Sequence, residues 1–160
     1  MSSVTTLTGV PGILRPFKEY LTGKNLAAGS QIAYYGCVGT CTPFVELLAY
    51  ATRDMNLSHL FVPLFDESNA RILKNVPGVG MQTGDPVDVK PEVIVLMGGL
   101  AMPGVPVTAE EGKAVVSRHG VPVAGVCFMN MFERSGWCDQ IPFEMMIDAT
   151  INPVTITKKE

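Results

Sequence analysis

The chain has 160 residues, of which 47% are hydrophobic and 17% are charged. This length suffices for one domain with a substantial core and is too short for two ordinary domains. The low share of charged residues predicts that much surface is buried, in the core or between subunits, so we expect a homo-oligomer. Twelve basic residues against fifteen acidic ones give a net charge of −3, which disfavours nucleic-acid binding.

The distribution of apolar residues predicts neither a membrane span nor an export signal. Glycines and Pro43 interrupt the longest uncharged run, 25–45, and no basic segment followed by an apolar one opens the chain. We therefore expect a cytoplasmic protein. In that compartment the four cysteines should be reduced thiols, because disulfide frameworks belong to exported domains.

The N-terminal third predicts an added helix followed by a strand–turn–helix unit. Apolar residues at helical spacing place the added helix within an N-terminal extension, residues 1–29, that packs on the domain. The apolar run Ile32–Tyr35 predicts a buried strand, and a glycine-containing loop, 36–42, follows it. Thr42 as N-cap and Pro43 at the first helical position mark the start of the next helix.

The middle of the chain predicts two strands separated by less regular structure. Leu60–Phe65 is expected to form a strand, and Ser68 to cap a short helix that runs to Lys74. Turn-forming residues in 79–90 predict a small hairpin or an irregular edge. The continuous apolar run Val93–Met97 is the strongest strand signal.

The C-terminal part predicts one more helix and two or three strands. Thr108 and Glu111 have the spacing of a capping box, and Gly120 closes the helix that they open. The segment Val123–Phe128 predicts a strand, and 143–156 predicts one or two more. Strands that alternate with helices imply a mainly parallel sheet in one three-layer, flavodoxin-like (Rossmann-like) domain, with strand order 2-1-3-4-5.

Sulfur-containing residues cluster where this topology places a ligand, at the carboxyl ends of the strands. We expect Gly36, Gly98 and Cys127 at this edge, with methionine sulfur nearby. Thiolates suit zinc, copper(I) or an iron–sulfur cluster, so one hypothesis is a metal centre held by Cys37, Cys41, Cys127 and Cys138. The alternative is that the cysteines pack in the core.

The same crevice predicts a site for a small molecule. Backbone N–H groups of residues 39–42, at a helix start, can hold an anion. No G-x-G-x-x-G pattern and no P-loop lysine is present, so a dinucleotide is less favoured. The candidate ligand-binding residues are Gly36, Gly39, Thr40, Thr42, Gly98, Gly99, Met102, Met129 and Asn130.

The run 93–99, which ends in Gly98–Gly99, and the later run 120–127 resemble the class I glutamine amidotransferase and PfpI superfamily. The resemblance implies a flavodoxin-like fold, Cys127 as a nucleophile and the two glycines as part of an oxyanion pocket. The superfamily usually has glycine two residues after the cysteine, where this chain has Met129.

A cysteine nucleophile also needs a base or a cationic neighbour. His59 and His119 precede predicted strands and should lie at the opposite edge of the sheet. Glu46 or Glu133 could approach Cys127 instead. We also expect Cys127 to be partly accessible and to react readily with alkylating agents, because it precedes a helix start.

Three longer motifs, at 36–44, 98–103 and 125–132, resemble an uncharacterised family of methanogenic archaea. That resemblance implies an anaerobic cytosol, where exposed thiols survive, and it implies no reaction. Three functions stay open: a binding or redox module that uses the sulfur-rich crevice, a cysteine-dependent hydrolase or transferase, and an assembly subunit. The lack of a suitably placed histidine favours the first.

Overall fold

The computed structural model describes residues 2–160 as an α/β protein built on one seven-stranded sheet of order β4-β3-β2-β1-β5-β6-β7. Five of these strands are parallel to one another. They are β1 (Gln31–Gly36), β2 (Ser58–Pro63), β5 (Pro91–Met97), β6 (Val123–Phe128) and β7 (Met145–Ala149). Counted among themselves they have the order 2-1-3-4-5, so the predicted flavodoxin-like arrangement is confirmed.

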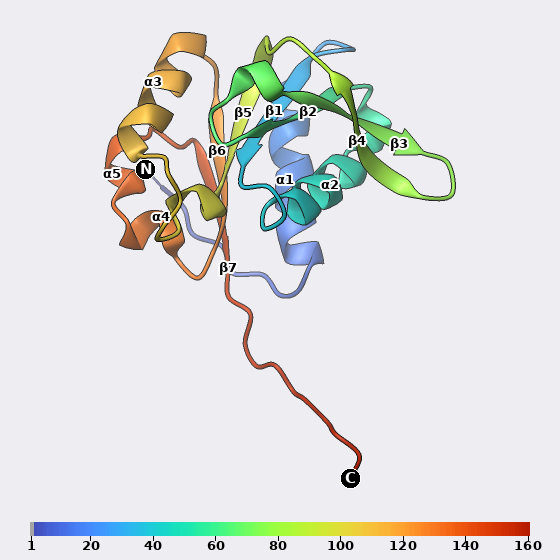
Figure 1. Ribbon diagram of the computed structural model, residues 1–160, viewed down its shortest axis with the longest axis vertical. Helices are drawn as coiled ribbons and strands as arrows, with labels where there is room; N and C mark the ends of the chain where they lie inside the picture. Colours follow the sequence, from blue (N-terminus) through green and yellow to red (C-terminus); the bar gives the residue numbers. More distant parts are fainter. Residues whose placement is uncertain (1) are drawn as a thin grey trace.

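Helices cover both faces of the sheet and complete the three layers (Figure 1). One face carries α1 (Pro11–Gly23) and α2 (Thr42–Ala51), and the other carries α3 (Ala109–His119) with the one-turn helices α4 (Met131–Arg134) and α5 (Trp137–Gln140). Alternate residues of the buried strands therefore enter two separate cores. In β1, for example, Tyr34 belongs to the α1–α2 core and Tyr35 to the α3–α5 core.

The helix predicted in the N-terminal extension is α1. Its residues Phe17 and Leu21 are fully buried against the sheet, which is the burial that the helical spacing predicted. The Tyr20 hydroxyl donates to Glu144 at 2.9 Å, and Lys24 forms an ion pair with the same carboxylate. These contacts attach α1 to the segment that leads into β7.

Two further predicted helix starts differ in how they are capped. At α3, Thr108 Oγ1 accepts the Glu111 N–H at 3.2 Å and Glu111 accepts the Thr108 N–H at 2.7 Å, so the capping box is confirmed. At α2 the N-cap is Cys41 rather than Thr42, and no side chain caps the helix. The Thr42 hydroxyl instead accepts the Gly39 N–H within the preceding loop.

The helix predicted from Ser68 to Lys74 is wrong. Only a 3-10 turn, η2 (Glu67–Asn69), forms there, and β3 (Arg71–Val76) then pairs antiparallel with β2. A turn containing Gly78 and Gly80, both with positive φ, leads into β4 (Gly80–Pro86), which pairs antiparallel with β3. Burial of Leu73 under α2, together with ladder hydrogen bonds to β2, outweighs the local helix signal.

Beyond β7 the last residues extend away from the body of the protein (Figure 1). The region 143–156 thus contributes one strand, β7, and residues 150–160 have no regular secondary structure. The loop 37–41 connects β1 to α2. A 3-10 turn, η3 (Gly98–Ala101), follows β5. Among residues 2–160, none of the helices has the length and apolar character needed to cross a bilayer.

Candidate functional site at the carboxyl ends of the strands

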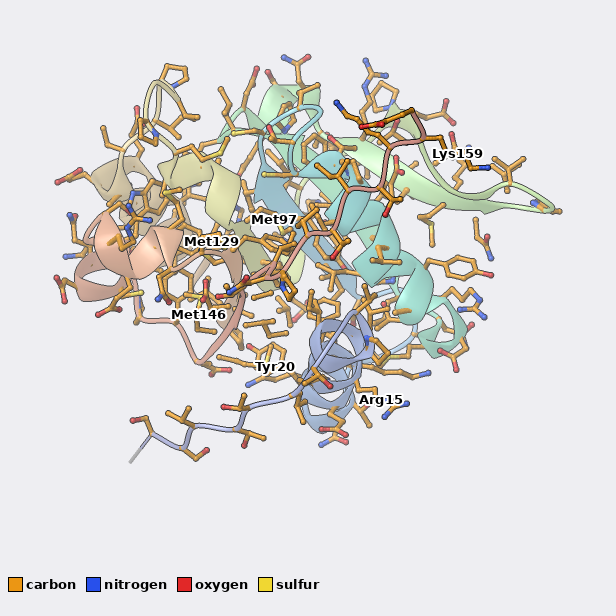
Figure 2. The ribbon with its side chains drawn as sticks, turned by 90° about the horizontal axis from the view of Figure 1, so that it is seen from below. Arg15, Tyr20, Met97, Met129, Met146 and Lys159 are labelled. Atoms are coloured by element: carbon orange, nitrogen blue, oxygen red, sulfur yellow. The ribbon has the colours of Figure 1, made fainter. Side chains whose placement is uncertain are left out.

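Gly36, Gly98 and Cys127 lie at one edge of the sheet, as predicted. Parallel pairing brings the end of β1 beside the end of β5, with Tyr35 opposite Leu96, and the end of β5 beside β6, with Met97 opposite Val126. Figure 2 views the molecule from this side, and Met97 and Met129 are labelled there. This is the edge at which proteins with open α/β sheets bind their ligands.

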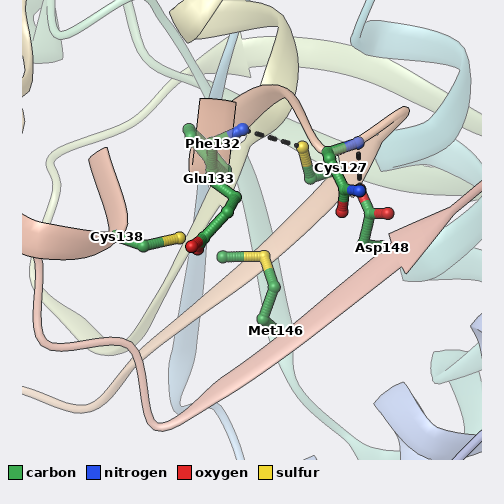
Figure 3. A pocket seen from close by; sticks show the side chains of 7 residues that line it. Cys127, Phe132, Glu133, Cys138, Met146 and Asp148 are labelled. Carbon is green, nitrogen blue, oxygen red and sulfur yellow. Dashed lines mark hydrogen bonds between the residues drawn. The ribbon is translucent and has the colours of Figure 1, made fainter. Parts of the chain in front are cut away.

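A pocket of about 210 Å³ opens at this edge beside β6 and β7 (Figure 3). Cys127 in β6 lies opposite Asp148 in the parallel strand β7, so their side chains emerge on the same face. The short helices α4 and α5 close the other side. The lining residues are Cys127, Asn130, Phe132, Glu133, Cys138, Met146 and Asp148.

Two backbone features shape this pocket. A Cβ on Gly125 would lie 2.5 Å from the Met146 methyl carbon and 2.8 Å from its sulfur, so the absence of a side chain at Gly125 leaves the space in which Met146 lies across β6. At the end of β6, Met129 and Asn130 both have left-handed backbone conformations, with φ of 57° and 58°. Such strain in consecutive non-glycine residues is often found at functional sites. The Asn130 N–H donates to Asp148 Oδ1 at 2.9 Å, which orients that carboxylate at the pocket.

The Cys127 thiol is poorly suited to act as a nucleophile. It is 1% exposed, and burial is the main reason that its pKa is raised, with the Asp148 carboxylate raising it further. The Phe132 N–H donates to its sulfur at 3.3 Å and opposes this shift without reversing it. The expectation of an accessible Cys127 is therefore wrong, because the turn covers the sulfur instead of exposing it, and the raised pKa gives no support to the expected reactivity.

Cys138, the more exposed thiol of the pocket, faces Glu133 (Figure 3). Burial, the Glu133 carboxylate and the nearby Cys127 together raise the pKa of Cys138 to about 11. No lysine, arginine or histidine is among the residues that line the pocket. The pocket thus combines two protonated thiols with two acidic side chains, and it offers acceptors rather than a thiolate.

Cys37 and Cys41 lie on the opposite face of the sheet from Cys127. They belong to the α1–α2 core, whereas Cys127 belongs to the α3–α5 core. Gly98 and Gly99 lie between the two faces, and cysteine sulfur atoms occupy the space beside them on both sides. A Cβ on Gly99 would lie 2.4 Å from the Cys41 sulfur, and one on Gly98 would lie 2.7 Å from the Cys127 sulfur.

The prediction that Cys37, Cys41 and Cys127 share one pocket, which Cys138 could join, is therefore wrong, and the thiols form two separate pairs. In the described part of the chain, residues 2–160, no three His, Cys, Asp or Glu side chains are grouped closely enough to hold a metal ion. The geometry thus gives no support to the expected four-cysteine metal or iron–sulfur centre. The glycine pair does not leave an open crevice, because the sulfur atoms themselves occupy the space.

Of the residues predicted to bind a small molecule, Asn130 lines the pocket. Met129 is 48% exposed beside it, and Met102 follows the η3 turn. Of the other predicted residues, Gly36 ends β1, Gly39 and Thr40 lie in the β1–α2 loop, and Thr42 begins α2. Gly98 and Gly99 lie in the η3 turn. The anion site predicted at 39–42 loses two of its donors, because Gly39 N–H donates to Thr42 and Cys41 N–H donates to Cys37.

Neither histidine lines the pocket. His59 lies near the start of β2, where Tyr34 and Thr52 hydroxyls contact its two ring nitrogens at 3.0 and 3.3 Å. His119 ends α3 and pairs with Glu67 at 2.6 Å. Glu46, which the sequence offers as an alternative base to Glu133, does not line the pocket either. Glu133 is thus the one candidate base that shares the pocket with Cys127, and no histidine or cationic side chain lines it, which argues against the amidotransferase-like role.

Sequence reasoning missed four lining residues as ligand contacts: Phe132, Glu133, Met146 and Asp148. The sequence suggests Glu133 only as a base for Cys127. The strand predicted within 143–156 was a usable signal, because alternate residues of a strand lie on one face, so that 146 and 148 share a side. Whether residues 146 and 148 face the α1–α2 core or the α3–α5 core depends on the register between β6 and β7.

The fold and this edge define an α/β protein of flavodoxin-like strand order with its pocket at the carboxyl ends of the strands. Residues 8–152 match a protein family described as "Uncharacterized protein conserved in archaea (DUF2124)". The chain belongs to this family. The resemblance to methanogen proteins is thereby confirmed, and the resemblance to glutamine amidotransferases and PfpI finds no support in these matches.

Individual relatives agree with this assignment. An uncharacterised protein of Methanothermobacter thermautotrophicus is 38% identical over 155 residues, which cover 95% of this chain and 96% of the relative. One of Methanocaldococcus jannaschii is 35% identical over 145 residues, covering 89% and 86%. A crystal structure of a protein of unknown function from M. thermautotrophicus superimposes with a TM-score of 0.86 at 32% identity, covering 99% of both chains.

Proposed function

We propose that this protein binds a small neutral or cationic ligand, rich in hydrogen-bond donors, in the pocket between β6, β7, α4 and α5. The observation that carries the proposal is that Glu133 and Asp148 both line a pocket to which no basic side chain contributes. Carboxylates accept strong, charge-assisted hydrogen bonds from ammonium and guanidinium groups and repel anions. The pocket therefore selects the charge of its ligand.

The size of the pocket limits what it holds. Its volume of about 210 Å³ is below the ~300 Å³ at which pockets for drug-sized molecules begin, so the ligand is small. Met146 and Phe132 supply apolar surface, while Asn130 adds a side-chain amide. A short alkyl chain with an ammonium or guanidinium head matches this combination of apolar walls and acidic acceptors.

The strained turn supports a binding role rather than a purely structural one. The left-handed conformation costs free energy at Met129, whereas asparagine adopts it more readily, and at Met129 it persists only where the surroundings enforce it. Here the turn directs the Asn130 N–H to the Asp148 carboxylate, which is thereby held at the pocket. A preorganised acceptor loses less conformational entropy when a ligand binds.

An NMR titration tests this proposal. The ¹⁵N-labelled protein is titrated with propylguanidinium and with butyrate, an anion of similar size. We expect saturable shifts of the Asn130 and Phe132 amides with the cation only. Asp148→Asn and Glu133→Gln should each weaken the affinity about tenfold, corresponding to about 1.4 kcal/mol.

Asp139→Asn is the matched control, because Asp139 is an exposed carboxylate on α5 that does not line the pocket. It should leave the affinity unchanged. Equal shifts with butyrate, an equal loss in Asp139→Asn, or no saturable shift with either probe would refute the proposal.

A further inference from the structure

Cys37 and Cys41 form a second thiol pair, on the face of the sheet opposite the ligand pocket. Cys37 directly follows β1 and Cys41 is the N-cap of α2, so a single turn of chain joins them, closed by a 3.0 Å hydrogen bond from Cys41 N–H to the Cys37 carbonyl. The Cys37 thiol donates to the Gly99 carbonyl at 3.2 Å. The two sulfur atoms converge on one point, 3.6 and 2.4 Å from where a Cβ on Gly99 would stand.

The pair is sheltered but lies directly under the surface. Cys37 is 8% exposed and Cys41 is 4% exposed, whereas Val38, Gly39 and Thr40, which connect them, are exposed. Gly39 has a φ of +85°, a conformation that glycine adopts without strain. A short exposed loop can adjust so that the two sulfurs reach the bonding distance of about 2.05 Å.

We propose that Cys37 and Cys41 act as a redox dithiol that reduces a low-molecular-weight disulfide and closes into an intramolecular disulfide. The Cys37 thiol, the more exposed of the two, loses its proton to solvent and attacks one sulfur of the substrate RSSR. One RS⁻ leaves and takes up a proton. Cys41, as a thiolate, then attacks the Cys37 sulfur, and the second RS⁻ leaves and is protonated.

The reaction balances without any further reagent. Two protein thiols and one disulfide give one protein disulfide and two RSH molecules, so the protein loses two electrons and two protons and the substrate gains both. A helix N-cap and a turn of three intervening residues keep the resolving thiol within reach of the mixed disulfide. This proposal does not depend on the small-ligand pocket, which lies on the other face of the sheet.

The surroundings of the pair predict a slow reaction at neutral pH that accelerates in alkali. Burial and the adjacent Cys41 raise the pKa of Cys37 to about 11. Burial also raises the pKa of Cys41, although backbone N–H groups of Cys37 and Gly99 oppose that shift. Because the thiolate is the attacking species, the rate should rise about tenfold per pH unit between pH 7 and pH 9. A thiol with a high pKa is also a slow leaving group, so the Cys37–Cys41 disulfide should be comparatively stable once formed.

The other thiol pair provides an internal comparison. The Cys127 sulfur is 1% exposed and accepts the Phe132 N–H, and Cys138 lies beside Glu133. Glutathione disulfide is itself anionic, so the acidic pocket should disfavour its approach to these thiols. Oxidation of the folded protein should therefore be confined to Cys37 and Cys41.

The test is anaerobic oxidation of the full chain with glutathione disulfide, followed by intact-mass measurement and peptide mapping. We expect the wild-type protein to lose the mass of two hydrogen atoms, with the new bond joining Cys37 to Cys41. Cys41→Ser should stop at a single glutathione adduct on Cys37, because no resolving thiol remains. Cys138→Ser is the matched control and should still form the Cys37–Cys41 bond.

Several results would overturn the proposal: no mass change in the wild-type protein, a disulfide that includes Cys127 or Cys138, or the same product from Cys41→Ser as from the wild type. A rate that does not change between pH 7 and pH 9 would contradict the thiolate step. If Cys41→Ser does not fold, the peptide map of the wild-type protein decides alone, because it needs no substitution.

Discussion

The Cys41 sulfur lies 2.4 Å from the point at which a Cβ on Gly99 would stand. Real Cβ atoms essentially never approach a neighbour so closely, so glycine is required here by its lack of a side chain. Gly98 is in a similar position on the other side, where a Cβ would lie 2.7 Å from the Cys127 sulfur and 2.9 Å from its Cα. The glycine pair is therefore a spacer between the two thiol pairs.

Gly99→Ala should lower the free energy of unfolding by about 1–3 kcal/mol, the usual cost of overpacking a core. Cys41→Ala in the Gly99→Ala background should recover part of this loss, because it removes the sulfur that the new methyl group meets. Gly98→Ala should lower the free energy of unfolding more than Gly99→Ala does, since its methyl group would meet the Cys127 Cα, a backbone atom that cannot rotate away. Chemical denaturation measures all three. Gly23→Ala, with nothing within 4 Å, is the control, and an additive double mutant would contradict the proposed contact.

The buried His59 should make the protein less stable in mild acid. Burial lowers its pKa from 6.5 to about 4. Between these values the unfolded chain binds more protons than the folded one, so stability falls as the pH decreases through this window and His59 contributes no further change below it. From pH 7 to pH 5 we expect a loss of about 2 kcal/mol from this residue. Denaturant unfolding of wild type and His59→Gln at both pH values isolates it, and equal pH dependence in the two proteins would contradict the prediction.

Cys138 should be alkylated before Cys127, and it should discriminate between reagents by charge. It is the partly exposed thiol of the pocket and lies beside Glu133, which repels anions. Relative to a free thiol, Cys138 should therefore favour neutral iodoacetamide over anionic iodoacetate severalfold, and Glu133→Gln should remove this preference. Mass spectrometry of peptides from the folded protein measures both rates. Faster labelling of Cys127 than of Cys138 would show that the turn at the end of β6 does not protect its sulfur.

The protein should form a homo-oligomer through its terminal segments. Ile151, Val154 and Ile156 are 61–78% exposed on a segment that extends from the body, and Val4 is 92% exposed near the other end (Figures 1 and 2). Apolar side chains on extended arms gain free energy when a second copy covers them. Light scattering should show a mass above that of one chain, and replacing Ile151, Val154 and Ile156 with serine should reduce it. A wild-type protein that is monomeric at high concentration would refute this expectation.

Local chemistry was sufficient to predict much of the fold. The Thr108–Glu111 capping box and the stop at Gly120 define α3 within the sequence itself, because their hydrogen bonds join residues three or four positions apart. Val93–Met97 could be identified as a central strand because a continuous apolar run is stable only where both of its faces are buried. Alternation of such strands with helices then limits the topology to a few choices, and the flavodoxin-like order was one of them.

The arrangement of the thiols was decided by tertiary structure alone. A cysteine at a strand end is compatible with either face of the sheet, and the register places Cys127 beside Asp148 on the α3–α5 side while Cys37 and Cys41 meet Gly99 on the other. The strand Arg71–Val76 likewise forms because β2 offers it an open edge that no local signal reveals. Contacts between residues distant in the chain depend on register and facing, and these become defined only when the whole sheet assembles.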